Sequence, residues 1–162
     1  MNEPVLGWER LQGRSGHEAG RQLLRAMYEK QVGAPLPRIA IGDRGKPYFP
    51  DSPWHFSISH TPDHVFCALA PEPVGLDAEE ADRTVRPALA QRVLSPGELR
   101  QWEASADRSR AFLTFWVLKE ALVKCSGEGL RGYPSHTAFS LNDPRVREID
   151  GCLVAVITGK DA

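Results

Sequence analysis

Three carboxylates, Asp77, Glu79 and Glu120, occupy positions where a charge needs a partner or a ligand. Glu120 lies in an apolar helical run and has tryptophan, valine and leucine neighbours on its own face; Lys124 follows one turn later. Asp77 and Glu79 alternate with apolar residues, so both project from one face of an expected strand, about 6.6–7 Å apart. A carboxylate among apolar side chains is costly unless it is paired or binds a metal.

The chemistry that these residue types favour involves a hard cation and phosphate. A small set of oxygen ligands with room for water suits Mg²⁺, which proteins usually share with substrate phosphates. Lys46, Lys119, Lys124 and Arg44 are cations suited to a phosphorylated substrate. No cluster of histidine and cysteine accompanies the carboxylates, so zinc is not expected. The residues alone predict Mg²⁺-assisted phosphoryl or phosphodiester chemistry, whereas solubilising charges on an edge strand are the alternative reading of the acidic pair on the strand.

Composition narrows the class of protein. The chain has 162 residues, enough for one sizeable domain or two small packed halves. Its net charge of -1 gives no reason to expect nucleic acid or a membrane surface as a partner. No segment approaches the roughly 20 apolar residues of a membrane span, and the N-terminus lacks the pattern of a signal peptide, so we expect a cytoplasmic protein. The scattered cysteines, Cys67, Cys125 and Cys152, argue against a disulfide framework.

The elements that must position these residues follow from periodicity and turn signals. In the first half of the chain the pattern predicts a helix over 17–30, a short strand over 39–41, a hairpin from 55–59 to 65–70, and a strand over 74–79. In the second half it predicts helices over 84–93, from Ser95, and from Asp107 or Ser109 to the Gly127-Glu128-Gly129 stop, then strands over 138–141 and 152–157. This order predicts an α+β protein in two halves, 1–82 and 83–162, with the site in the cleft between them.

Four short motifs resemble the signatures of one family, the 4′-phosphopantetheinyl transferases. They are a Ser-His pair in Phe56–His60, a Gly-x-Asp-x-Glu segment in Val74–Glu79, a Trp-x-x-Lys-Glu-Ala-x-x-Lys helix in Trp116–Lys124, and Gly45–Pro47 upstream. Their order and spacing agree with the family over about residues 14–134. The Asp-x-Glu segment lies in the middle of the chain, which resembles the single-chain type with two pseudosymmetric halves, each a helix packed on a small antiparallel sheet.

The resemblance implies an enzyme that transfers 4′-phosphopantetheine from coenzyme A to a serine of an acyl or peptidyl carrier protein, a post-translational modification that releases adenosine 3′,5′-bisphosphate. By the same resemblance, Asp77, Glu79 and Glu120 would hold Mg²⁺ against the pyrophosphate. Glu120 and Lys124 would be the catalytic residues: Glu120 as the base for the carrier serine, and Lys124 as a cation on the phosphate.

The resemblance also implies residues that bind coenzyme A. Lys46 and His60 would reach the 3′-phosphate and adenine side, with Ser59 beside them. Lys119 would neutralise phosphate charge, and Arg44 is expected to contribute to the same cationic surroundings.

The sequence departs from the family pattern after Tyr133. Only two short strands are expected there, so the second half is predicted to be shortened at the C-terminus. Three explanations stay open. The shortened half alters carrier docking, a dimer completes the missing edge of the sheet, or the chain is a fragment. The alternative to an active transferase is therefore a relative that binds coenzyme A or a carrier protein without catalysis.

Overall fold

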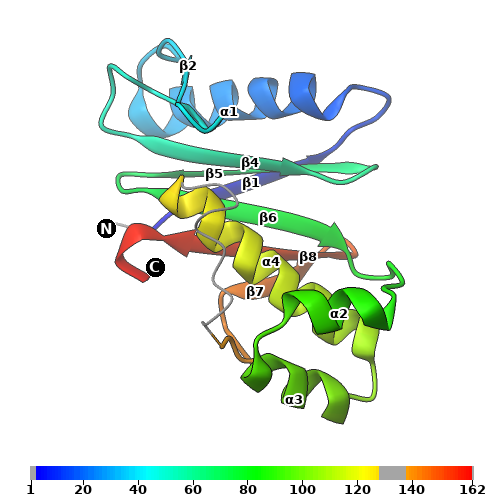
Figure 1. Cartoon of the computed structure of the whole chain (residues 1–162). Coiled ribbons are helices and arrows are strands. Elements are labelled where there is room, and N and C mark those ends of the chain that lie inside the picture. Colours follow the sequence, from blue (N-terminus) through cyan, green and yellow to red (C-terminus); the bar gives the residue numbers. More distant parts are fainter. Residues whose placement is uncertain (1–2, 128–137, 162) are drawn as a thin grey trace.

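The computed structural model describes residues 3–127 and 138–161 (Figure 1). Its elements form two three-stranded antiparallel sheets, a separate two-stranded hairpin and four α-helices within these residues. This confirms the predicted α+β class. The division at residues 82 and 83, the pseudosymmetry of the halves and the shortening of the second half stay predictions.

The first sheet has the strand order β1-β5-β4 and carries one long helix. Its elements are β1 (Val5–Arg10), α1 (Gly16–Val32), β4 (His55–His60) and β5 (His64–Ala70), with the hairpin β2 (Ala40–Ile41) and β3 (Pro47–Tyr48) between α1 and β4. Ser15 caps α1 by accepting a hydrogen bond from the backbone of Glu18, and Gly33, at a φ of 74°, ends it. Sequence reasoning did not predict β1.

The second sheet has the strand order β6-β8-β7. Its strands are β6 (Val74–Glu80), β7 (Val146–Ile149) and β8 (Cys152–Thr158), which leads into a 3-10 turn, η2 (Gly159–Asp161); between β6 and β7 come α2 (Pro87–Val93), α3 (Pro96–Ala104) and α4 (Arg108–Ser126). Asp107 caps α4 and Gly127 ends it, as predicted, whereas the rest of the expected stop, Glu128-Gly129, lies outside the described residues.

The strand predicted over 138–141 is wrong. Backbone groups of this segment bond to side chains of α3 instead of to a strand: the N–H of Phe139 donates to Glu98 at 2.9 Å, and that of Leu141 donates to Gln101 at 3.1 Å. The strand that precedes β8 in the chain and pairs with it comes later, at β7. The alternating apolar pattern of 138–141 therefore reflects packing under α3, because Phe139 belongs to the core of the helical layer.

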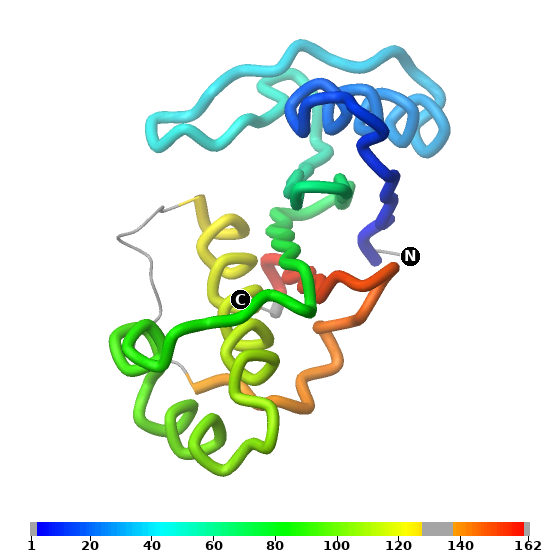
Figure 2. Tube along the Cα trace, turned by 90° about the vertical axis from the view of Figure 1, so that its right-hand side faces the viewer, coloured from blue at the N-terminus to red at the C-terminus, as the bar shows by residue number. Residues whose placement is uncertain are grey.

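The elements stack in four layers, and strand alternation assigns each side chain to one interface. On β5, Val65, Cys67 and Leu69 join the core under α1, whereas Phe66, Ala68 and Ala70 face the second sheet. On β6, Val74, Leu76 and Ala78 meet that face, as their pattern predicts. Figures 1 and 2 show the result: α1 covers one side of the paired sheets, and α4 with α2 and α3 covers the other.

The close packing of α4 on β6 depends on one glycine. A side-chain carbon at Gly75 would lie 1.9 Å from the carbonyl oxygen of Ala121 and 2.4 Å from the backbone nitrogen of Cys125. Only a residue without Cβ lets the helix approach the strand so closely. The next residues on the same face of β6, Asp77 and Glu79, therefore lie beside α4.

Candidate functional site

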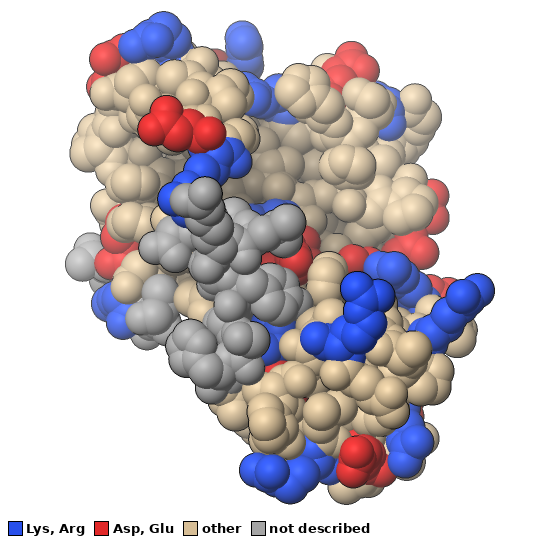
Figure 3. All heavy atoms as spheres, in the orientation of Figure 1, with Lys and Arg blue, Asp and Glu red and all other residues tan. Residues whose placement is uncertain are grey.

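A hollow opens where β4 and β6 lie side by side next to α4. It is lined by Ile58, Ser59, His60, Thr61, Pro62, Asp77, Ala78, Glu79 and Lys124. Figure 3 shows this region as a depression between the part of the molecule that carries α1 and the part that carries α2 and α3, with acidic side chains beside it. The structure thus brings together in one hollow five residues that sequence analysis selected from three separate motifs.

Asp77 is the centre of the hydrogen bonds in this hollow. Its Oδ1 accepts from the Ser59 hydroxyl at 3.2 Å and from the Lys124 ammonium at 3.1 Å. Its other oxygen, Oδ2, is buried and has no hydrogen-bond partner among the described residues. Buried carboxylate oxygens are normally satisfied, so this atom points to a ligand that the protein itself does not supply.

Burial, and to a smaller degree neighbouring charges, shift the ionisation of Asp77 and Glu120. Burial raises the pKa of Asp77 above its ordinary value, although Lys124 lowers it in part. Burial also raises the pKa of Glu120, and the negative charges of Asp77 and Glu79 add to the effect while Lys124 opposes it. Lys124 therefore offsets only part of the cost of ionising Asp77 and Glu120.

The third carboxylate, Glu79, has a partner of its own. Its Oε2 accepts from Arg83 at 3.0 Å, just after the end of β6. Sequence reasoning missed Arg83; its spacing of four residues from Glu79 is a signal only in a helix, and here the chain turns after the strand.

The donor set fits Mg²⁺ in its chemistry. In residues 3–127 and 138–161, no three His, Cys, Asp or Glu side chains are grouped closely enough to hold a metal as they stand. However, the unpartnered Oδ2 of Asp77 and the raised pKa of both Asp77 and Glu120 are features that a divalent cation would relieve. Hard carboxylate oxygens with no sulfur or imidazole ligand suit Mg²⁺.

His60 lies at the outer side of the hollow, against the first turn of α1. A Cβ at Gly16 would come within 2.5 Å of three atoms of the imidazole ring, so the ring packs directly on the backbone of that glycine. Ser59, the other member of the pair, is buried and accepts a bond from the Ala78 N–H at 3.3 Å in addition to its contact with Asp77. Ser59 therefore ties β4 to β6.

Lys119 does not face the hollow. Its ammonium and the carboxylate of Glu98 are both fully buried and lie 2.7 Å apart, on the side of α4 that packs against α3. A side chain enclosed in this way cannot reach a phosphate in the hollow. The expected phosphate role of Lys119 therefore does not fit its position, which is that of a core ion pair.

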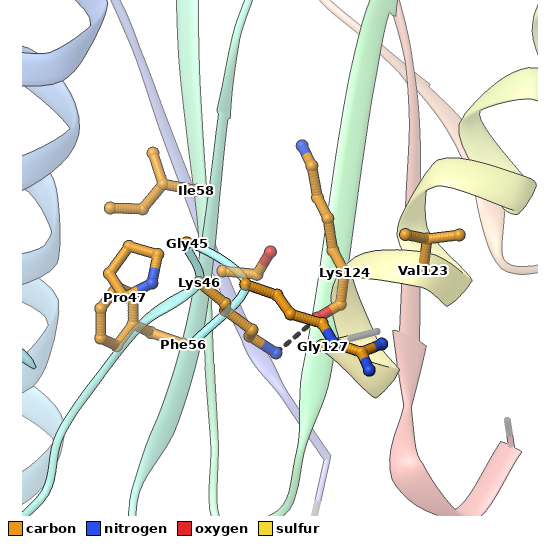
Figure 4. Close-up of a pocket in the computed structure, with 10 residues that line it drawn as sticks. Gly45, Lys46, Pro47, Phe56, Ile58, Val123, Lys124 and Gly127 are labelled. Atoms are coloured by element: carbon orange, nitrogen blue, oxygen red, sulfur yellow. Dashed lines mark hydrogen bonds between the residues drawn. The ribbon is translucent and has the colours of Figure 1, made fainter. Parts of the chain in front are cut away.

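Arg44 and Lys46 line a second pocket next to the first, and Lys124 borders both. Figure 4 shows the apolar lining of this pocket, including Phe56 and Ile58. In the same view the Lys46 ammonium points to the C-terminal end of α4, where it donates to the carbonyl of Lys124. The predicted coenzyme A ligands thus lie along two adjoining hollows, except Lys119.

Comparisons with known proteins show the family to which the chain belongs. A model of the 4′-phosphopantetheinyl transferase superfamily matches residues 73–154, which include β6 and α4. The chain therefore belongs to this superfamily.

Individual relatives match more of the chain. It is 33% identical over 119 residues to a 4′-phosphopantetheinyl transferase of Bacillus subtilis, which covers 68% of this chain and 51% of that protein. It is 38% identical over 119 residues to the 4′-phosphopantetheinyl transferase AcpT of Salmonella typhimurium, covering 67% of this chain and 57% of that protein. The chain thus spans about half the length of the curated relatives that it matches.

Proposed function

We propose that the protein is an enzyme that transfers 4′-phosphopantetheine from coenzyme A to a serine of an acyl or peptidyl carrier protein, with Mg²⁺, in the cytoplasm. The observation that carries this proposal is the buried, unpartnered Oδ2 of Asp77, within a hollow that also holds Glu79 and Lys124. Family membership supplies the class of reaction. No helix of the described residues is long and apolar enough to cross a membrane.

The three carboxylates have two roles in this proposal, as metal ligands and, for Glu120, as proton acceptor. Asp77, Glu79 and Glu120 would hold the Mg²⁺, which when bound supplies positive charge to the pyrophosphate of coenzyme A. A carboxylate has two oxygens and several lone pairs, so Glu120 can also accept a proton. Burial and the neighbouring carboxylates raise the pKa of Glu120 in the metal-free protein, and a bound Mg²⁺ would keep this carboxylate ionised, the form in which it accepts a proton.

In the proposed reaction, a phosphoester bond to the carrier serine forms while the pyrophosphate of coenzyme A is cleaved. The carrier serine hydroxyl gives its proton to Glu120 while its oxygen forms a bond to the phosphorus that bears the pantetheine arm. The bond from this phosphorus to the bridging oxygen of the pyrophosphate breaks, and adenosine 3′,5′-bisphosphate leaves with the electron pair. Lys124, at the border of the two hollows, stabilises the negative charge that develops on phosphate oxygens. His60 and Arg44 are proposed contacts for the adenosine and 3′-phosphate end.

The test is to incubate the protein with coenzyme A, Mg²⁺ and an apo carrier protein, and to measure the mass of the carrier. We expect the gain of one phosphopantetheine arm with the wild type and none with Asp77→Ala. Asp51→Ala removes an exposed carboxylate outside both hollows and is the matched control, expected to transfer as the wild type does. Coenzyme A binding without transfer by the wild type would favour the non-catalytic alternative.

A further inference from the structure

The ammonium group of Lys46 donates its hydrogen bonds to backbone carbonyls. Its Nζ donates to the carbonyl of Val74 at 3.2 Å, to that of Lys124 at a short distance, and to that of Cys125 at 3.5 Å. An ammonium group has three N–H donors, and three acceptors surround this one. Its aliphatic stem passes Gly127, where a Cβ would lie 3.7 Å from Lys46 Cδ.

Two of these carbonyls belong to the last turn of α4. The final four carbonyls of a helix have no partner within it and carry the negative end of the helix dipole. The carbonyl of Val123 accepts from the Gly127 N–H at 3.0 Å and from the Ser126 hydroxyl at 3.0 Å. The two carbonyls that follow are those bound by Lys46, so this cation completes the end of the helix.

The contact joins elements that are far apart in the sequence. Lys46 belongs to the β2–β3 hairpin, whose turn is closed by the Gly42 N–H on the Lys46 carbonyl at 2.9 Å. Lys124 is 78 residues further on, and its backbone is held by Lys46 while its side chain binds Asp77. A displacement of the α4 end would therefore move the ammonium group that faces the site.

We infer that Lys46 is a positioning residue, which clamps the C-terminal end of α4 to the β2–β3 hairpin and so places Lys124 against Asp77, rather than a ligand of the coenzyme A 3′-phosphate. The carbonyl oxygens compensate the positive charge of the half-buried ammonium group, and its three N–H donors already bind them. This inference deepens the proposed function, but the contact itself exists in the free protein and can be tested there.

The first test uses amide hydrogen exchange of the free protein and does not depend on catalysis. Lys46→Met keeps the stem and removes the ammonium, so the last turn of α4 should exchange about tenfold faster than in the wild type, as the loss of bonds from a charged donor predicts. Lys30→Met removes an exposed lysine from the last turn of α1 and should leave exchange in α4 unchanged. Unchanged exchange in Lys46→Met would overturn the inference.

The second test compares coenzyme A with dephospho-coenzyme A, which lacks the 3′-phosphate, as donors for transfer. A positioning residue predicts that Lys46→Met lowers kcat by the same factor with both donors, because Lys124 is misplaced whichever donor is bound. A 3′-phosphate ligand predicts a rise in KM confined to coenzyme A, and that result would overturn the inference. If the wild type transfers nothing, the proposed function fails while the exchange experiment still decides the role of Lys46.

Discussion

Two lysines of α4, five residues apart, make ion pairs of opposite character. Lys119 and Glu98 both have side-chain exposures of 0%, whereas Lys124 is 33% exposed and Asp77 10%. Glu98 is fully engaged: it accepts from Lys119, from the Ser95 N–H at 2.9 Å and from the Phe139 N–H at 2.9 Å. Asp77 keeps one buried oxygen without a partner among the described residues.

The difference shows how one helix can serve both the core and the site. A saturated, enclosed pair adds to stability only as long as both members remain, because each one compensates the buried charge of the other. An incompletely satisfied pair at a hollow costs stability and leaves capacity for a ligand. We therefore expect the two pairs to respond to mutation in opposite ways.

The largest expected effect is on stability, at the enclosed pair. Lys119→Ala leaves the Glu98 charge buried without its cation, so the free energy of unfolding should fall by about 3–5 kcal/mol. Urea unfolding measures this directly. Lys30→Ala, at an exposed lysine, should stay within about 0.5 kcal/mol of the wild type. A loss below about 1 kcal/mol for Lys119→Ala would show that the pair is not a structural anchor.

At the hollow, Asp77→Asn should do the reverse. The substitution is nearly isosteric and removes a charge whose ionisation the fold disfavours, so the free energy of unfolding should equal or exceed that of the wild type. Transfer of phosphopantetheine should nevertheless fall by about 10²–10³-fold, the scale of losing one preorganised electrostatic group. Asp82→Asn, at an exposed residue just after β6, should change neither quantity. A variant that loses stability but keeps activity would reverse the assignment of the two pairs.

Gly75→Ala should affect both lysines together, since α4 meets β6 at this glycine. The added carbon would lie 1.9 Å from the Ala121 carbonyl, so the helix must shift, and we expect a loss of about 1–3 kcal/mol in the free energy of unfolding. Gly159→Ala is the control, because its added carbon would meet Pro73 at 3.4 Å, near ordinary contact. If Gly75→Ala unfolds like the wild type, the close approach does not determine where α4 lies.

Much of this arrangement could be predicted from the sequence because the signals are local. The alternation in β6 assigned Asp77 and Glu79 to one face, and the capping residues Ser95 and Asp107 marked the starts of two helices. Ser95 and Glu98 lie three residues apart, the spacing of a capping box, and the structure contains that box. These features depend on neighbours within about four residues.

What could not be predicted depends on contacts between distant segments. The second role of Glu98, as the partner of Lys119, follows from how α3 packs on α4, and no periodicity encodes it. β1 has only half-buried and exposed residues and joins its sheet by pairing with β5, about 60 residues away. The carbonyl contacts of Lys46 likewise could not be predicted, because they join the β2–β3 hairpin to the end of α4, 78 residues further along the chain.

The smallest expected effect is in the pH dependence of stability, and it distinguishes the two pairs without catalysis. For Asp77 the pKa is raised in the folded state above its ordinary 3.8, chiefly by burial. Between these two values the folded protein binds more protons than the unfolded chain. The contribution of Asp77 to stability is therefore fully present below pH 3.8 and is lost as the pH rises through the folded pKa.

Other carboxylates change stability with pH in the opposite direction, so the comparison must be made between variants. Asp143, whose pKa is lowered chiefly by its hydrogen bond from Arg145, contributes stability that is lost as the pH falls. Subtracting the urea unfolding free energy of the wild type from that of Asp77→Asn cancels such distant terms and leaves Asp77 together with its effect on Glu120, which has the same sign. This difference should grow as the pH is raised from 3.8 through the folded pKa of Asp77, and level off above it. A difference independent of pH would mean that Asp77 ionises in the fold as readily as in water, and the contrast with the saturated pair of Lys119 would then rest on geometry alone.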